Sequence, residues 1–191
     1  MAGTIGGRVR RPVAPRPVAP RPVAPRPVAP GAVTGRATRA PDITLRRAVP
    51  GDIPACGRIL FDAFATLAHE HGFPPDFPTV AVATACMRGL VENPGFHGVV
   101  AERDGRPIGS TFLDERSTIN AIGPVSVDPA AQDGRVGRLL MEAMLERAAE
   151  LRAPGVRLVQ ISYHNRSLSL YAKLGFDVRE TFAAMYGRRC D

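Results

Sequence analysis

Two segments in the second half of the chain have residue types and spacings that could serve a ligand site. Residues 125–140 read VSVDPAAQDGRVGRLL: a strand-like alternation stops at Pro129, and a turn with glycines opens a helical pattern. The N-terminus of a helix carries unpaired N–H groups and about half a positive charge. Glycines let a phosphate approach that backbone closely. The segment therefore suits a pyrophosphate, although an ordinary strand–helix connection would have the same pattern.

The second segment, residues 165–176, reads NRSLSLYAKLGF and follows an apolar run. Asn165 stands where a helix N-cap is favoured and Gly175 where a helix ends, which predicts a short helix over 167–174. Leu168 and Tyr171 share one face of this helix. A tyrosine on an apolar face is more often a core residue than a catalytic one.

Strands and helices elsewhere in the chain would position these two segments. Period-2 alternation or short apolar runs predict strands at 43–48, 98–103, 107–113, 117–127, 156–163 and 176–183. Helical spacing of apolar residues predicts helices at about 52–68, 79–91, 134–152 and 167–174. Asp104-Gly105 is a strong hairpin signal. The order β-α-α-β-β-β-α-β-α-β predicts an α/β (α+β) fold with helices on the faces of a mixed sheet.

The basic charge of the chain is concentrated at its N-terminus. The formal net charge is +7, yet residues 1–41 contain eight arginines and no acid, while residues 42–191 have 17 basic against 18 acidic residues. RPVAP is repeated four times over 11–30, and this proline content excludes a helix or an interior strand. We expect a disordered tail over 1–41 and one folded domain over 42–191, with no nucleic-acid partner.

Together, the two segments resemble the motifs of the GCN5-related N-acetyltransferase (GNAT) family. The family motif Q/R-x-x-G-x-G/A after a V-x-P strand end is similar to Gln132–Gly137 after Val127–Pro129. The second motif, N-x-x-S-x-x-L-Y-x-K-x-G-F, is one position longer than residues 165–176 but is similar to them at Asn165, Leu170, Tyr171, Lys173, Gly175 and Phe176, with its serine offset. The resemblance covers roughly residues 43–186 and implies a GNAT-like mixed, mostly antiparallel central sheet flanked by helices.

The resemblance also implies an activity: direct transfer of an acetyl group from acetyl-CoA, as co-substrate, to an amine acceptor. The loop before the helix would hold the CoA pyrophosphate, and the preceding strand would pair with the pantetheine arm. The cofactor-binding residues implied are Val125, Val127, Gln132, Gly134, Arg135, Val136, Gly137, Arg138 and Asn165. Tyr171 would protonate the departing thiolate, a role suited to a phenol with a pKa near ~10.

Two positions depart from the family pattern. Arg135 occupies the first glycine position of the loop; if its φ is positive, arginine costs about 1–2 kcal/mol there. Ala121 stands where many members have a carboxylate, so the general base is open. The candidate bases, each of which is more often a solvated surface charge, are Glu115 first, then Asp114 and Glu102.

Other features restrict the function less sharply. His69 and His71 have no third ligand nearby, so no metal site is expected. Three cysteines are too few for a disulfide framework, and no apolar run reaches the roughly 18 residues of a membrane helix. A cytoplasmic protein without a membrane partner is expected. Since the first two helices flank the acceptor pocket in the family fold, residues 61–77 are a candidate part of it.

Two other functions stay open on the sequence alone. Ala121 and Arg135 fit a catalytically weak acyl-CoA-binding protein, and the repeat arm fits an interaction protein that recruits a partner. The identity of the acceptor and the formation of a homodimer are equally open.

Overall fold

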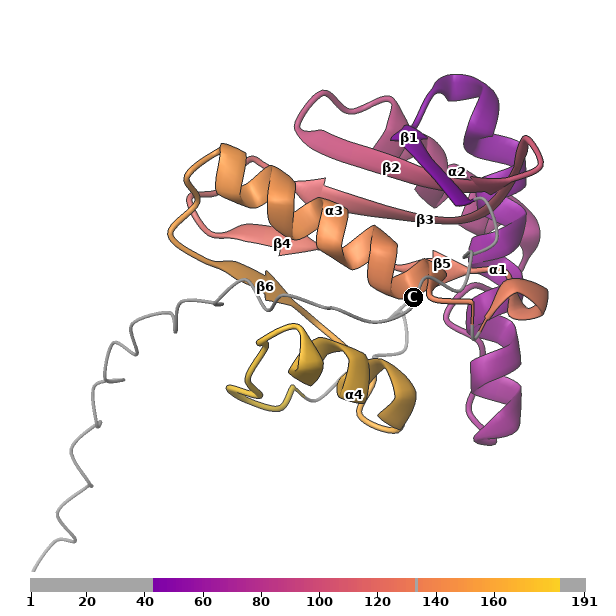
Figure 1. Cartoon of the computed structure of the whole chain (residues 1–191). Coiled ribbons are helices and arrows are strands. Elements are labelled where there is room, and N and C mark those ends of the chain that lie inside the picture. The colour runs from indigo at the N-terminus through magenta and orange to yellow at the C-terminus, as the bar shows by residue number, and fades with distance from the viewer. Residues whose placement is uncertain (1–42, 133, 183–191) are drawn as a thin grey trace, which may run out of the picture.

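The computed structural model describes residues 43–132 and 134–182, which form three layers (Figure 1). A sheet lies between a layer of two helices, α1 and α2, and a layer that contains α3. Within these residues the helices are α1 (Ile53–Glu70), α2 (Val80–Val91), α3 (Val136–Glu150) and α4 (Asn165–Lys173). The strands are β1 (Ile43–Arg47), β2 (Phe96–Arg103), β3 (Arg106–Asp114), β4 (Asn120–Ile122), β5 (Ser126–Val127) and β6 (Val156–Leu158). The predicted tail 1–41 lies outside the described residues.

The sheet is mixed and mostly antiparallel, as predicted. Its order is β1-β2-β3-β4-β6, with β5 paired to β3 beside β4. The pair β4–β6 is parallel and the other pairs are antiparallel. The predicted hairpin joins β2 to β3, with φ of 52° at Asp104 and 72° at Gly105, the left-handed values that a tight hairpin turn requires.

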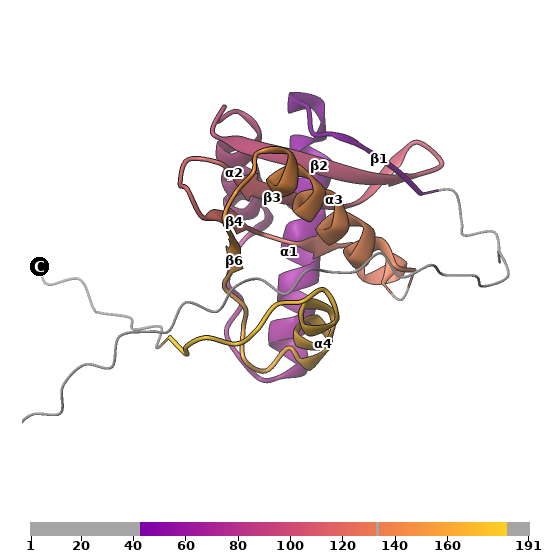
Figure 2. The same ribbon diagram turned by 60° about the vertical axis from the view of Figure 1, so that its left-hand side comes forward.

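Alternation along β2 and β3 divides the core between the two faces of the sheet. Val99, Ala101 and Leu113 pack against α3, whereas Val100 and Phe112 pack against α1 and α2. Successive residues of a strand point to opposite faces, so the apolar run of β2 fits a strand covered on both sides. Figure 2 shows α1 and α3 on opposite sides of the strands, with α4 below the sheet.

Three predicted strands differ from the structure. The strand expected over 117–127 is split into β4 and β5 by Gly123-Pro124, because proline has no N–H for the ladder. The strand expected over 156–163 ends at Leu158, and Val159 is 80% exposed, so it is not covered on both faces. Residues 176–182 form no strand. The strand expected next to them is shortened to β6, which ends at Leu158.

The cap of α4 differs from the prediction, and the residue before α1 has another role. Asp52 precedes α1 but makes no capping bond; its carboxylate accepts from Arg46 at 2.7 and 2.6 Å and from the N–H of Val49 at 2.8 Å. Arg46 also donates to Glu102 at 2.6 Å, so three chain segments are tied together. Asn165 is the first residue of α4 and His164 holds the cap position. Gly175, with φ of 92°, follows the end of α4 as predicted.

The two cysteines of the helical layer have different environments. Cys56 is buried in the core beneath α1. Cys86 on α2 is exposed, because its side of that helix faces away from the sheet. No helix in the described part of the chain is long and apolar enough to cross a membrane.

Candidate active site

The start of α3 has the free donors that the sequence predicted for an anion site. Among the described residues, the N–H groups of Val136, Gly137 and Arg138 donate to no protein acceptor; the first backbone bond runs from Leu139 to the carbonyl of Arg135, at 3.0 Å. These are the orphan donors of a helix N-terminus. They open on the loop that begins at Gln132, so this loop can present several N–H groups to one phosphate.

Arg135 immediately precedes these donors in a left-handed conformation, with φ of 64° and ψ of 1°. The cost stated above for a positive φ at Arg135 therefore applies. The side chain is exposed and is held in a backbone region that favours glycine.

We expect the substitution Arg135→Gly to stabilise the fold by about 0.5–1 kcal/mol. Relief of left-handed strain contributes about 1–2 kcal/mol, and the greater freedom of glycine in the unfolded chain offsets about half of it. Urea unfolding of both proteins measures the difference. The exposed substitution Arg179→Gly is the control, and equal or lower stability of Arg135→Gly would refute the strain.

The strand before the loop has an edge turned away from β3. Asp128 N–H donates to the carbonyl of Ile108 at 2.9 Å, and Ser126 pairs with Ser110. Because hydrogen-bonding direction alternates in an antiparallel pair, the main-chain groups of Val125 and Val127 face the opposite side. Gln132 Nε2 lies 3.5 Å from the carbonyl of Val127 on that side. This edge can therefore accept an extended ligand arm as an added strand.

α4 lies beside the start of α3 and brings the two sequence motifs together. Arg166 Nη1 donates to Gln132 Oε1 at 3.2 Å. A Cβ at Gly137 would lie 3.6 Å from Leu170 Cδ2 and 3.8 Å from Val127 Cγ2, so strand, loop and both helices meet at this glycine. The residues expected to bind the cofactor from Val125 to Arg138 thus share one region with α4, while the Asn165 side chain, at the start of α4, is exposed.

Tyr171 is half-buried on the inner face of α4, where it packs against the core that includes α3. Its ring meets that of Phe176 edge-on, with centroids 6.1 Å apart. Burial raises the pKa of the Tyr171 phenol above its usual value, and the Ser167 hydroxyl one turn earlier opposes this in part. The phenol therefore keeps its proton at neutral pH. Ser167 Oγ in turn lies 2.7 Å from His164 Nδ1.

Arg103 is a residue at this site that the sequence reasoning missed. Its guanidinium reaches the loop from the end of β2, such that a Cβ on Gly134 would lie 3.2 Å from Arg103 Nη2. Its Nε is buried and makes no hydrogen bond to any described residue. Only the register of β2 against β1 and β3 places Arg103 here, and no local motif signals it. By contrast, Arg138 is paired with Glu142 at 2.8 Å along α3.

The candidate bases do not gather around Tyr171. Glu115 lies beside the C-terminal part of α3, where its carboxylate accepts a hydrogen bond from Arg147 Nε at 2.8 Å. This arginine holds the pKa of Glu115 below its usual range. Asp114 is paired with Arg116, which lowers its pKa in the same way. Glu102 is paired with Arg46. Each carboxylate is therefore held in an ion pair, because an arginine from a neighbouring turn, helix or strand reaches it.

The segment 61–77, a candidate part of the acceptor pocket, approaches the start of α4. Phe73 and Tyr163 stack with centroids 4.5 Å apart and planes at 3°, and His71 lies against the same tyrosine at 4.8 Å. This contact links the end of α1 to the loop before α4. No cluster of histidine, cysteine and carboxylate with metal-binding geometry occurs over 43–132 and 134–182.

Comparison with known proteins identifies the class to which this site belongs. Residues 94–178 match a family model described as an acetyltransferase (GNAT) domain, which covers β2 to α4 and thus both motifs. Over these residues, which make up less than half of the chain, the protein matches a GNAT acetyltransferase domain. No curated protein matches the sequence.

Solved structures of acetyltransferases share the fold at low sequence identity. The ribosomal-protein-S18-alanine N-acetyltransferase from Escherichia coli has a TM-score of 0.59 at 17% identity, over 72% of this chain and 79% of that one. An aminoglycoside acetyltransferase from an uncultured soil metagenomic sample has a TM-score of 0.57 at 18% identity, over 76% and 99%. A predicted acetyltransferase with acetyl-CoA from Clostridium acetobutylicum has a TM-score of 0.58 at 14% identity, over 75% and 96%.

Proposed function

We propose that the protein transfers the acetyl group of acetyl-CoA directly to an amine acceptor, with the cofactor bound between β5, the start of α3 and α4. One observation carries this proposal: the unpaired N–H groups of Val136–Arg138 lie beside α4, the helix that contains Tyr171. The Arg166–Gln132 hydrogen bond of 3.2 Å joins α4 to the loop before these groups. The GNAT domain match and the structural neighbour with acetyl-CoA support the choice of cofactor.

The cofactor would bind by its charge at one end and by main-chain pairing along its arm. The diphosphate would accept from the N–H groups at the start of α3, where the helix dipole favours an anion. The pantetheine amides would pair with Val125 and Val127 on the outward edge of β5, as an added strand does. An N–H of that edge would also donate to the thioester carbonyl, where negative charge develops in the transition state.

Transfer needs one nucleophile and one acid. The neutral amine attacks the thioester carbon, the carbon–sulfur bond breaks, and the thiolate takes a proton from the Tyr171 phenol. The attacking nitrogen loses a proton to water, and water returns a proton to the Tyr171 phenolate. Burial raises the pKa of Tyr171, which keeps the phenol protonated until a thiolate forms. A positioned proton donor of this kind typically contributes about 10²–10⁴-fold.

No carboxylate base is part of the proposal. Glu115, Asp114 and Glu102 are each held by an arginine, and Ala121 offers no charge. The acceptor therefore enters as its free base, and we propose that it approaches past the aromatic contact of Phe73 with Tyr163. Activity is expected to rise with pH as more acceptor becomes neutral.

The test is an acceptor panel. The full chain, acetyl-CoA and individual amines are mixed with a thiol reagent that reports free CoA, with small amines, amino acids, aminoglycosides and peptide N-termini as separate arms. Amine-dependent CoA release supports the proposal. Tight binding of acetyl-CoA by calorimetry without release for any amine would instead support the acyl-CoA-binding alternative.

We expect Arg103→Gln to weaken acetyl-CoA binding by about fivefold to tenfold. The guanidinium stands beside Gly134 with a buried, unpartnered Nε, and a hydrogen bond to a charged group is worth about 1.5–3 kcal/mol, reduced here by partial exposure. Calorimetry measures the change. Arg106→Gln, on the exposed side of the same hairpin, is the matched control, and equal losses in both variants would exclude a specific contact.

A further inference from the structure

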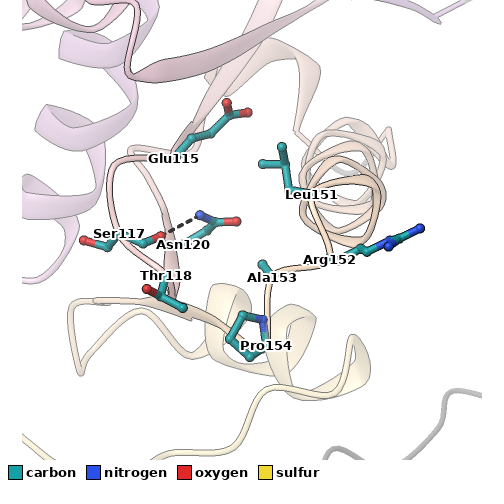
Figure 3. Close-up of a pocket in the computed structure, with 8 residues that line it drawn as sticks. All are labelled: Glu115, Ser117, Thr118, Asn120, Leu151, Arg152, Ala153 and Pro154. Atoms are coloured by element: carbon teal, nitrogen blue, oxygen red, sulfur yellow. Dashed lines mark hydrogen bonds between the residues drawn. The ribbon is translucent and has the colours of Figure 1, made fainter.

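A pocket lies at the opposite end of α3 from the proposed cofactor site. It is formed where the turn between β3 and β4 meets the segment that follows α3, and its volume is about 310 Å³. α3 has 15 residues, so roughly 22 Å of helix separates the pocket from the free N–H groups. Figure 3 shows its lining, which consists of Glu115, Ser117, Thr118, Asn120, Leu151, Arg152, Ala153 and Pro154.

Asn120 is the unusual member of this lining. The residue is only 3% exposed and occupies β4 two positions before Ile122, on the face of the strand that packs into the core with α3. An apolar side chain would suit that face of β4. The amide instead turns towards the pocket, between Glu115 and Ala153 (Figure 3).

The orientation of the Asn120 amide is fixed by its neighbour. Nδ2 donates to the carbonyl of Ser117 at 3.1 Å, and the reversed amide would place two acceptors against each other. Oδ1 is thus the atom left on the pocket side, where it is buried and accepts from no described residue. Since an unpaired buried carbonyl is costly, this oxygen favours a ligand that brings a donor.

The rest of the wall adds a second acceptor and apolar surface. The Glu115 carboxylate borders the pocket, and Arg147 holds it with one short contact of 2.8 Å and one long contact of 3.4 Å, so the second oxygen keeps accepting capacity. Arg147 is also bound to Glu150, and the Arg152 side chain points away from the pocket (Figure 3). Leu151 and Pro154 form an apolar wall.

We propose that this pocket binds a small primary amine in its ammonium form, which donates to Asn120 Oδ1 and to the carboxylate of Glu115. The two acceptors, Asn120 Oδ1 and the Glu115 carboxylate, favour a ligand with N–H groups. The C-terminal end of α3 adds a partial negative charge, which favours a cation. The apolar wall and the small volume restrict the ligand to a short alkyl chain. This site is separate from the acetyl-transfer site and does not depend on that proposed function.

The test is a titration of the full isotope-labelled chain with butylammonium, followed by the amide resonances of Asn120 and Gly155. Gly155 reports locally because its carbonyl accepts from the Asn120 N–H at 3.2 Å. We expect saturable shifts at both residues. Shifts confined to residues around α4, or none that saturate, would overturn the proposal, because the amine would then bind only at the transfer site or nowhere.

Two further ligands separate charge from hydrogen bonding. Butyltrimethylammonium is a cation without N–H groups, and 1-butanol is a neutral donor of the same chain length. Both are expected to bind at least about tenfold more weakly than butylammonium: butyltrimethylammonium loses the hydrogen bonds, and 1-butanol loses the charge that strengthens them. Equal binding of either ligand would contradict the assigned contacts.

Variants of the wall complete the test. Asn120→Val removes the acceptor and restores an apolar row with Ile122, and Glu115→Gln removes the charge; each is expected to weaken butylammonium by about tenfold or more. Asp114→Asn, an acid on the same turn that does not line the pocket, is the matched control. Unchanged affinity in a folded wall variant would refute the contact that the variant removes. If one variant folds poorly, the other still tests the site.

Discussion

Replacing Tyr171 by phenylalanine is expected to lower kcat for acetyl transfer by about 10²–10⁴-fold, with little change in acetyl-CoA affinity. The substitution removes only the hydroxyl, so the packing of the ring against Phe176 and the α3 core is retained. Steady-state kinetics with the best acceptor of the panel, together with calorimetry of acetyl-CoA, separate the two effects.

The pH profile gives this prediction a second readout. A phenol donates its proton only while it is protonated, and burial places the pKa of Tyr171 above its usual value of about 10. The wild-type rate should therefore fall only above that pH, and the Phe variant should lose this falling limb. Unchanged acetyl-CoA affinity in the same variant is the control for correct folding of the site. An unaltered kcat in Tyr171→Phe would remove Tyr171 from the acid role.

Replacing Asp52 by alanine is expected to destabilise the fold by about 2–3 kcal/mol. The carboxylate is 5% exposed and accepts two bonds from Arg46 and one from Val49, and breaking a buried pair from one side leaves an uncompensated charge. The expected loss lies below the usual 3–5 kcal/mol because Arg46 is 34% exposed and still forms its ion pair with Glu102 in the variant. Urea unfolding measures the loss.

The same pair gives a pH dependence of stability with a definite sign. Arg46 and the Val49 N–H lower the pKa of Asp52 below its unfolded value, so the pair stabilises the fold above about pH 4. This contribution is lost as the pH falls through the lower pKa of the folded state. Asp52→Ala should therefore remove part of the acid dependence. Glu92→Ala breaks an exposed pair with Arg88 and should cost no more than about 0.5 kcal/mol; an equal loss in both variants would contradict the account.

Features set by local sequence were predictable. Asp104-Gly105 fixes the hairpin because both residues tolerate positive φ, and Gly175 ends α4 for the same reason. The free N-terminus of α3 follows from glycines ahead of an amphipathic pattern. Even the strain at Arg135 could be stated as a condition, since the motif places a glycine there in related sequences.

Features set by tertiary contacts were not predictable. The run 156–163 is apolar enough for a long strand, but after Leu158 the chain turns away towards α4, where Tyr163 stacks on Phe73. Glu115 was chosen by its position in a turn, and nothing in the sequence indicated that Arg147, a residue 32 positions later, would bind it. Arg103 reaches the loop through strand register alone. In each case the deciding neighbour is far away in sequence.

The most direct test of the central claim is a titration of the isotope-labelled full chain with CoA, followed by backbone amide resonances. The account predicts the largest shifts at Gly134 and at the unpaired donors of Val136, Gly137 and Arg138, with smaller shifts along α4 near Tyr171. Gly155, at the far end of α3, should not move. Saturable binding that leaves Gly134–Arg138 unshifted would contradict the account, because the cofactor would then be held elsewhere.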